Sequence, residues 1–226
     1  MKKKINIYAF VQARQTSKRL PNKIFLKLNR LTILKNIYLR LKKSRFLNDI
    51  IYLIPDNPKN LELKNYLKSE KYKFFCGEER NVLKRFYDAS KKFNPDLIVR
   101  ITADCPLVDY RLLDEMIINF LKLKNVDYIS NTIQRSYPDG LDIEIFTKKA
   151  LNTAFKNAKN KYDLEHVTPY MQKKMKVSNY LNNKDYSKLR WTLDTLEDYN
   201  RLSSMFNKFK LKVSSSWKKA LNHENS

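Results

Sequence analysis

Four basic side chains lie close together in a short segment near the N-terminus, VQARQTSKRLPNK, at residues 11–23. They are Arg14, Lys18, Arg19 and Lys23. The segment contains no acidic residue and follows the apolar run 5–11, which predicts a buried strand. A basic, irregular loop between a strand and a helix is suited to holding phosphates at the carboxyl edge of a sheet. Charge alone leaves a second interpretation equally open, a basic loop exposed to solvent.

Two aspartates directly follow predicted strands and could hold a metal ion. Asp104 lies in a DCP turn after the apolar run 97–101, and Asp194 ends the run RWTLD before a helix. Mg²⁺ prefers oxygen ligands and is usually bound by one or two carboxylates together with substrate phosphates. If their strands are neighbours, these carboxylates would bridge one Mg²⁺ on a nucleotide triphosphate and neutralise charge on the α-phosphate during attack. Spacing does not show that they are neighbours, and an aspartate before a turn or helix also has ordinary structural roles.

Further polar side chains occur around the middle of the chain. In PDGLDIEIF, Asp142 and Glu144 would face one side of a strand with apolar residues opposite, and Asp139 precedes them. This pattern predicts either an acidic edge that binds a sugar or supports a metal, or a solvated strand face. Arg100 lies in an otherwise apolar strand, so its burial would require a phosphate, base or carboxylate partner. His166 lies beside apolar residues, where a structural role is more common than a catalytic one.

The elements that must position these residues alternate regularly through the first half of the chain. Predicted strands cover 5–11, 50–54, 72–75 and 97–101, and predicted helices cover 31–41, 61–67, 82–93 and 112–121. This alternation favours an α/β fold with a parallel or mostly parallel sheet and helices on both faces. Active sites of such sheets lie outside the carboxyl ends of the strands, where both the basic loop and Asp104 fall.

The second half of the chain is less regular. Expected strands cover 126–130, 141–146, 177–181 and 189–193, and expected helices cover 149–157, 164–171 and 196–206. Thr195 is the predicted N-cap of the last helix, with Asp198 at the third helical position. We expect one domain over residues 1–211 and a short C-terminal tail, 212–226, in which the pattern fades.

The charge of the chain narrows the possible partners. It has 46 Lys and Arg against 23 Asp and Glu, a formal net charge of +23. Such an excess suits either nucleic acid or a polyanionic small substrate. The lysines are dispersed, and no zinc-finger, basic-zipper or RNA-recognition pattern occurs, so we expect no specific nucleic-acid partner.

Residue content also excludes several kinds of site. Only two glycines occur, Gly77 and Gly140, which excludes the glycine-rich phosphate loops of Rossmann and Walker type. The two cysteines predict neither a disulfide scaffold nor a metal cluster. No apolar run approaches the roughly 18 to 20 residues of a membrane span, and the apolar N-terminal run lacks a small-residue cleavage site. We therefore expect a cytoplasmic protein without membrane insertion.

Five segments occur in this order along the chain: QARQTSKRLPNK, RITADCPLVD, YPDGLDIEIF, EHVTPY and RWTLDTLEDY. Together they resemble the motifs of the CMP-sugar synthetases, over about residues 4–207. The resemblance is greatest to the cytidylyltransferases of spore-coat polysaccharide biosynthesis, which are related to the acylneuraminate and 3-deoxy-manno-octulosonate cytidylyltransferases. Thr16, Asn22 and Ala103 stand where glycine is usual in these enzymes.

The resemblance implies a fold and a reaction. The fold is the three-layer nucleotide-diphospho-sugar transferase fold with a mostly parallel central sheet, in a single nucleotidyltransferase domain that often forms a homodimer. In the reaction a hydroxyl of a small sugar, here expected to be an acidic sugar, attacks the α-phosphate of CTP. The products are a CMP-sugar for polysaccharide biosynthesis and pyrophosphate, and the cofactor is Mg²⁺.

By position, the resemblance also implies the roles of individual residues. The implied nucleotide-binding residues are Gln12, Ala13, Arg14, Ser17, Arg19, Lys23, Arg100 and Thr102. The arginines and lysine of the loop would hold the triphosphate through charge-assisted hydrogen bonds. The implied catalytic residues are Arg14, Lys23 and Asp104. The implied metal ligands are Asp104 and Asp194. The implied sugar-binding residues are Asp139, Asp142, Glu144 and His166.

Other interpretations stay open. A glycosyltransferase of the same fold would use a nucleotide sugar that is already made, but the D-x-D metal motif usual in such enzymes is absent from the Asp104 turn, which reads DCP. A basic nucleic-acid-binding protein and a relative that has lost catalytic activity are the remaining alternatives.

Overall fold

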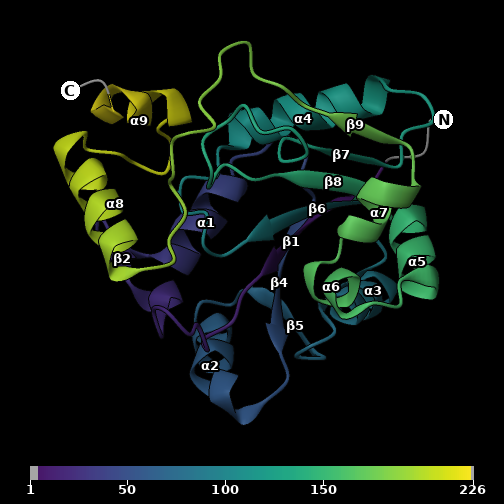
Figure 1. Ribbon diagram of the computed structural model, residues 1–226. Helices are drawn as coiled ribbons and strands as arrows, with labels where there is room; N and C mark the ends of the chain where they lie inside the picture. Colours follow the sequence, from purple (N-terminus) through teal and green to yellow (C-terminus); the bar gives the residue numbers. More distant parts are fainter. Residues whose placement is uncertain (1–4, 225–226) are drawn as a thin grey trace.

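A seven-stranded sheet forms the middle of the structure, a computed structural model that describes residues 5–224 (Figure 1). Its strands are β1 (Ile7–Gln12), β4 (Asp49–Pro55), β5 (Lys73–Gly77), β6 (Leu97–Thr102), β7 (Tyr128–Ser130), β8 (Glu144–Thr147) and β9 (Val177–Asn179). They lie in the order β5-β4-β1-β6-β8-β7-β9. Only β8 runs antiparallel to its neighbours, β6 and β7, so the sheet is mostly parallel, as predicted. A separate hairpin joins β2 (Lys27–Leu28) and β3 (Leu31–Thr32).

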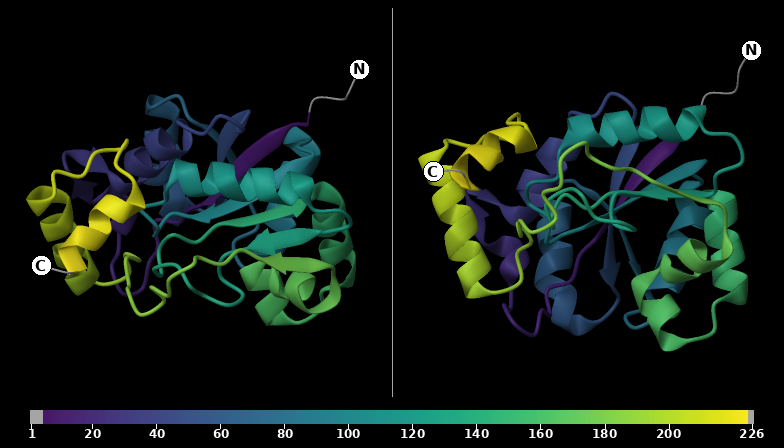
Figure 2. Two further views of the ribbon diagram at one scale, coloured as in Figure 1. Left: turned by 90° about the horizontal axis from the view of Figure 1, so that it is seen from above. Right: turned by 45° about the horizontal axis from the view of Figure 1, so that its top comes forward.

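Helices cover both faces of this sheet (Figure 2). Those on the first face are α1 (Ile33–Leu41), α2 (Leu61–Ser69), α4 (Tyr110–Lys122), α8 (Leu196–Lys208) and α9 (Trp217–Glu224). Those on the second face are α3 (Val82–Phe93), α5 (Lys148–Asn157), α6 (Lys161–His166) and α7 (Pro169–Lys174). Along β1 the side chains alternate between the two cores, with Ala9 and Val11 in the first and Phe10 in the second. The predicted three-layer α/β fold is therefore confirmed.

The strand order reverses between β1 and β6. From β1 the chain adds β4 and β5 on one side and then returns to place β6 on the other side. The loops that follow β1 and β6 consequently diverge at the carboxyl edge of the sheet and leave a crevice between them. Both the basic loop and Asp104 follow these two strands, so the predicted site lies at this reversal.

Polar side chains determine where several helices begin. Thr32 accepts a hydrogen bond from the backbone N–H of Lys35 at the start of α1, and Thr195 and Asp198 form the predicted capping box of α8. Two 3₁₀ helices, η1 (Lys23–Phe25) and η2 (Pro58–Asn60), complete the elements near the basic loop. Among the helices of residues 5–224, none combines the length and the apolar character needed to cross a bilayer.

Some predicted elements are wrong. Residues 189–193 form no strand, because their backbone N–H groups bond to turns, with Trp191 donating to Asp139 and Leu193 donating to Asp104. Residues 141–143 are not in a strand, because the side chain of Asn131 takes the place of a neighbouring strand and bonds the backbone of Leu141 and Ile143. The helix expected at 164–171 is divided into α6 and α7 by a turn.

The C-terminal segment packs against the body of the protein. The buried guanidinium of Arg40 donates to the backbone carbonyls of Lys212 and Ser215, and the N–H of Trp217 donates to Asp109. Trp217 and Ala220 lie in the first core. The division into a domain at 1–211 and a tail at 212–226 stays a prediction, and residues 225 and 226 of that tail lie outside the described residues.

Candidate active site

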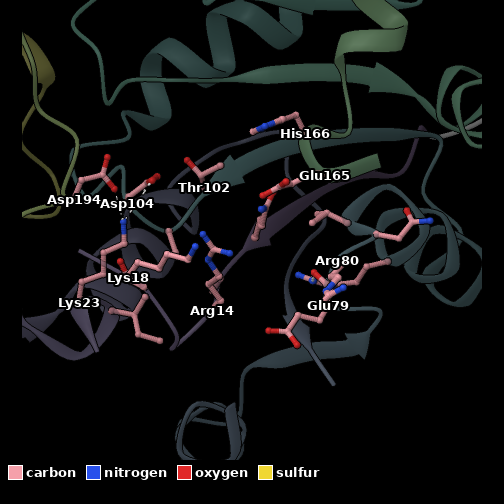
Figure 3. A pocket seen from close by; sticks show the side chains of 18 of the residues that line it. Arg14, Lys18, Lys23, Glu79, Arg80, Thr102, Asp104, Glu165, His166 and Asp194 are labelled. Atoms are coloured by element: carbon pink, nitrogen blue, oxygen red, sulfur yellow. Dashed lines mark hydrogen bonds and ion pairs between the residues drawn. The ribbon is translucent and has the colours of Figure 1, made fainter. Parts of the chain in front are cut away.

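A cavity of about 1200 Å³ opens at the carboxyl edge of the sheet between β1 and β6 (Figure 3). Its walls come from the basic loop, the turn after β6, the connection between β5 and α3, and α6. These predicted site residues line it: Gln12, Ala13, Arg14, Ser17, Arg19, Lys23, Thr102, Asp104, His166 and Asp194. The structure therefore brings together residues that are up to 182 positions apart in the chain, Gln12 and Asp194.

The basic loop is held against α2 by a residue that the sequence did not single out. The backbone N–H of Gln15 donates to Asn60 at 2.9 Å, and its side chain donates to Glu62 at 2.6 Å. At the end of the loop Asn22 takes a left-handed conformation, with φ of 58°, which asparagine tolerates better than most residues. Asn22 thus supplies the conformation that glycine would supply, whereas Thr16 does not have a positive φ.

Lys23 joins the two predicted metal ligands. Its ammonium is 2.8 Å from Asp194, 3.6 Å from Asp104 and 2.7 Å from the carbonyl oxygen of Leu193 (Figure 3). The N–H of Leu193 in turn donates to the carbonyl oxygen of Asp104 at 2.8 Å, which places the two aspartates side by side. The question that the spacing left open, whether Asp104 and Asp194 are neighbours, is answered by this arrangement.

Asp194 is surrounded by positive charge. Besides Lys23, it contacts Arg19 at 2.9 Å and Arg190 at 3.1 Å. Burial alone would raise the pKa of Asp194, but these cations lower the pKa more, so the net shift is downward. Asp194 is therefore an ionised carboxylate in the folded protein at neutral pH.

The pair Asp104 and Asp194 fits a divalent cation that substrate phosphates help to bind. Within residues 5–224, no three acidic, histidine or cysteine side chains gather into a complete metal site. Two carboxylates are nevertheless the protein ligands that Mg²⁺ commonly has when phosphates and water supply the rest. The ammonium of Lys23 lies between them, which shows that the position accommodates a positive charge.

Five cationic side chains line the cavity without an ion-pair or hydrogen-bond partner elsewhere in the described part of the chain. They are Arg14, Lys18, Lys59, Arg80 and Lys161. The first two belong to the basic loop, and the other three come from η2, from the connection before α3 and from the start of α6. No sequence signal indicated these three, because single basic residues in separate segments resemble ordinary surface residues. Together they provide a concentrated binding surface for a polyanion.

A second cavity of about 460 Å³ adjoins the first, and both are lined by Thr102 and His166. The second is also lined by Arg100, Asp142 and Glu144, three of the predicted site residues. Arg135 and the hydroxyl and amide groups of Thr132, Tyr162, Thr168 and Gln172 complete its polar wall.

The sequence model of the Cytidylyltransferase family matches residues 8–215, which is nearly the whole chain. The chain belongs to this family. A cytidylyltransferase from Leptospira borgpetersenii has the same fold with a TM-score of 0.91 and 35% identity, over 96% of this chain and 93% of that one. The spore coat polysaccharide biosynthesis protein SpsF of Bacillus subtilis is 27% identical, over 90% of this chain and 87% of SpsF. CMP:2-keto-3-deoxy-manno-octonic acid synthetase, solved with CTP, shares the fold with a TM-score of 0.71 at 13% identity, over 91% of this chain and 100% of that one.

In this member of the family, the acidic edge expected from PDGLDIEIF is paired with arginines. Asp142 accepts two hydrogen bonds from Arg135, at 2.6 and 3.0 Å. Asp139 contacts Arg190 at 3.2 Å and Arg135 at 3.5 Å. Asp139 lines neither cavity, and burial together with the charge of Asp142 raises its pKa despite both arginines. Arg135 and Arg190 were not predicted as site residues, since nothing in the sequence linked them to these acids.

Arg100 has the carboxylate partner that its burial required. It forms an ion pair with Glu144, and it also donates to the side chain of Gln12 at 3.1 Å. Burial lowers the pKa of Arg100, but the charge of Glu144 and its hydrogen bond raise the pKa more. Arg100 therefore stays charged and connects the end of β1 to β8.

Proposed function

We propose that this protein transfers the cytidylyl group of CTP to a hydroxyl group of a sugar, giving a CMP-sugar and pyrophosphate. The observation that carries the proposal is the meeting of two cavities at Thr102 and His166, beside Asp104. The first cavity has the volume and the unpaired cations that a nucleoside triphosphate requires. The second has the polar side chains that a sugar requires. Thr102 and His166 line both cavities and form their common wall. A sugar hydroxyl and an α-phosphate would meet at this common wall.

The nucleotide would lie in the first cavity. Arg14, Ser17 and Arg19 would bind the triphosphate together with Lys23, since Arg and Lys form short, charge-assisted bonds to phosphate oxygens. Gln12, Ala13 and Thr102 would lie close to the rest of the nucleotide, and Arg100, which lines the second cavity, would act on it through its hydrogen bond to Gln12. The family to which the chain belongs supports CTP as the nucleotide.

A magnesium ion would be held by Asp104 and Asp194. When bound, it neutralises charge on the α-phosphate as the sugar oxygen attacks and pyrophosphate leaves. Lys23 keeps the two carboxylates aligned, and Arg14 and Lys23 stabilise charge that develops on the phosphate oxygens. These three roles make Arg14, Lys23 and Asp104 the proposed catalytic residues.

The sugar would lie in the second cavity, in contact with Asp142, Glu144 and His166. Asp139 would influence the sugar only through its ion pair with Arg135. For an acidic sugar, the unpaired Lys161, which lines the first cavity at the start of α6, offers a cation. The likeness to SpsF supports a role in polysaccharide biosynthesis. We further propose that the enzyme works in the cytoplasm and forms a homodimer. Light scattering on the purified protein would test the homodimer.

The experiment that tests this function is an assay of pyrophosphate release. The protein is incubated with CTP, Mg²⁺ and a panel of 2-keto-3-deoxy sugar acids, and each reaction is repeated with EDTA and with Asp104→Asn. We expect release with at least one sugar, and loss of release in both controls. No release with any sugar together with no CTP binding would refute the proposal, whereas binding of a nucleotide sugar but not CTP would point to a glycosyltransferase. Tight, steeply salt-dependent binding of DNA or RNA would favour the nucleic-acid alternative.

A further inference from the structure

The turn between α6 and α7 has a strained backbone. Val167 has φ of 72° and ψ of −54°, and the N–H of Thr168 donates to the carbonyl oxygen of His166 at 2.8 Å. These values describe the rarer, strained form of the three-residue γ-turn. A positive φ is unusual for any residue with a side chain and is a marked outlier for a β-branched one. Such a conformation persists only where the surrounding structure enforces it, and it is found most often at functional sites.

Buried contacts enforce this turn from both sides. The side chain of Val167 is fully buried in the second core, and the backbone N–H of Val167 donates to the backbone carbonyl oxygen of Asp163 at 3.0 Å. The hydroxyl of Thr168, a residue only 3% exposed, donates to Glu144 at 2.8 Å. Tyr128 donates to the same oxygen of Glu144 at 2.8 Å. Side chains of the strands β7 and β8 therefore hold the turn in place.

The turn determines where His166 lies. His166 is the last residue of α6, and it lines both cavities. Its side chain reaches the cavity from above, on the same side as Thr102 and Glu165 and across from Arg14 (Figure 3). If the helix continued through Val167 instead, the chain would not reverse at this point and His166 would lose its fixed place on the common wall.

Hydrogen bonds also connect the turn to the first cavity. Glu144 pairs with Arg100, and Arg100 donates to Gln12, which lines the first cavity. A buried chain of side chains thus runs from the end of β1 to Thr168. Each side chain of this chain is hydrogen-bonded to the next, although the Nε of Arg100 has no partner, and these bonds link the geometry of the nucleotide cavity to that of the turn.

We propose that His166 contacts both substrates at once, the phosphate of the nucleotide and a hydroxyl of the sugar, and that Glu144 and Thr168 are positioning residues that act through the strained turn. This inference rests on the proposed function for the identity of the two substrates. It goes beyond that function because it assigns the strained turn a role in aligning the two substrates.

The first test observes His166 itself and requires no turnover. The chain has two histidines, so the imidazole NMR signals can be assigned with His166→Gln. We expect CTP with Mg²⁺ to shift the His166 signals of the wild-type protein. We also expect Thr168→Val, which removes the hydroxyl but keeps the shape, to move or broaden these signals in the free protein, and Thr168→Ser to restore them. Thr153→Val on the exposed face of α5 is the matched control and should leave them unchanged.

The second test uses a sugar that supports pyrophosphate release. His166→Gln and Thr168→Val should each lower kcat/KM for the sugar by about 100-fold, as expected when a reacting group is misplaced by about 1 Å, while Thr168→Ser stays near wild type. The Kd for CTP should change much less than kcat/KM. If Thr168→Val does not fold, Thr168→Ala serves in its place.

The outcomes separate this inference from the proposed function. His166 signals that are identical in wild type and Thr168→Val would overturn the positioning role, and signals that CTP does not shift would overturn the contact with the nucleotide. Either result can occur in a protein that makes a CMP-sugar. Conversely, a wild-type protein that binds no CTP would refute the proposed function and with it the bridging role, while a response of the free protein to Thr168→Val would still establish the positioning by the turn.

Discussion

Lys23 and Asp194 form an ion pair at the centre of the site, with 2.8 Å between the ammonium nitrogen and a carboxylate oxygen. The same ammonium lies 3.6 Å from Asp104, and Lys23 is only 9% exposed. One nearly buried lysine therefore connects the basic loop to two carboxylates, that of Asp104 after the strand β6 and that of Asp194 before the helix α8. The loop and the two acids form one unit, so that a change in Lys23 should affect metal and phosphate binding together.

Lys23→Met should abolish most of the activity without unfolding the protein. Loss of one preorganised donor to a reacting phosphate lowers kcat by about 100-fold or more. The fold should persist because Asp194 retains Arg19 and Arg190 as partners. Pyrophosphate release and thermal unfolding are measured in parallel, with Lys43→Met, an exposed lysine beyond α1, as the control. Near-normal pyrophosphate release by Lys23→Met would contradict the proposal that Lys23 joins the basic loop, Asp104 and Asp194 into one functional unit.

The pH dependence of stability should depend on Asp198. Burial raises the pKa of Asp198, but Arg190 and the backbone N–H groups of Asp194 and Thr195 lower it more, so the folded-state pKa is below the ordinary value of 3.8. A carboxylate with a lowered pKa stabilises the fold above the unfolded-state pKa, and this contribution is lost as pH falls through the folded-state pKa.

Urea unfolding at pH 7 and at pH 3 measures this effect. The unfolding free energy of the wild type should fall toward pH 3, and Asp198→Asn should lower it at pH 7 and flatten the dependence. Glu197→Gln changes the exposed neighbour and should leave the dependence as in wild type. If Asp198→Asn and Glu197→Gln behaved alike, the lowered pKa would not contribute to stability.

Much of the fold could be predicted because its signals are local. The apolar runs of β1, β4 and β6 are mostly buried strands, and the capping residues Thr195 and Asp198 mark the start of α8. The place of the candidate site could be predicted in part, since the basic loop and Asp104 follow the parallel strands β1 and β6, whose carboxyl ends lie at one edge of the sheet, whereas Asp194 follows no strand.

The remainder depends on contacts between distant segments. Residues 189–193 alternate like a strand, yet their N–H groups bond to Asp139 and Asp104, which no local pattern reveals. Val167 has a strong preference against a positive φ, and the bond between Thr168 and Glu144 that overrides it joins residues 24 positions apart. Likewise, Lys59 and Lys161 become part of the cavity only through the tertiary fold.

Arg100 and Glu144 should contribute strongly to stability. Their side chains are 14% and 7% exposed, so Arg100→Met would leave Glu144 charged and almost without solvent. Breaking a buried pair in this way costs about 3 to 5 kcal/mol of unfolding free energy. The exposed i,i+4 pair of Lys84 and Asp88 provides the contrast, because Lys84→Met should cost only about 0.5 kcal/mol.

Urea unfolding of both variants gives the comparison directly. The double variant Arg100→Met, Glu144→Leu should recover part of the loss, because it leaves no buried charge without a partner. Equal effects of Arg100→Met and Lys84→Met would show that the first pair is not buried in solution.

The two glycines of the chain should respond very differently to alanine. Gly140 has φ of 111°, and a Cβ there would lie 2.5 Å from the backbone carbon of Trp191 and 2.7 Å from the nitrogen of Thr192. The backbone of this segment cannot move away without displacing Asp194, so Gly140→Ala should lower the unfolding free energy by about 3 kcal/mol or more and reduce CTP binding as well.

At Gly77 an added Cβ would meet the side chains of Arg85 and Phe75 at 3.0 Å, and these can shift, so Gly77→Ala should lower the unfolding free energy by about 1 kcal/mol. Thermal and urea unfolding of the two variants measure the difference. A Gly140→Ala protein as stable as Gly77→Ala would mean that the segment before Asp194 does not pass so close to Gly140, and the placement of Asp194 beside Lys23 would have to be revised.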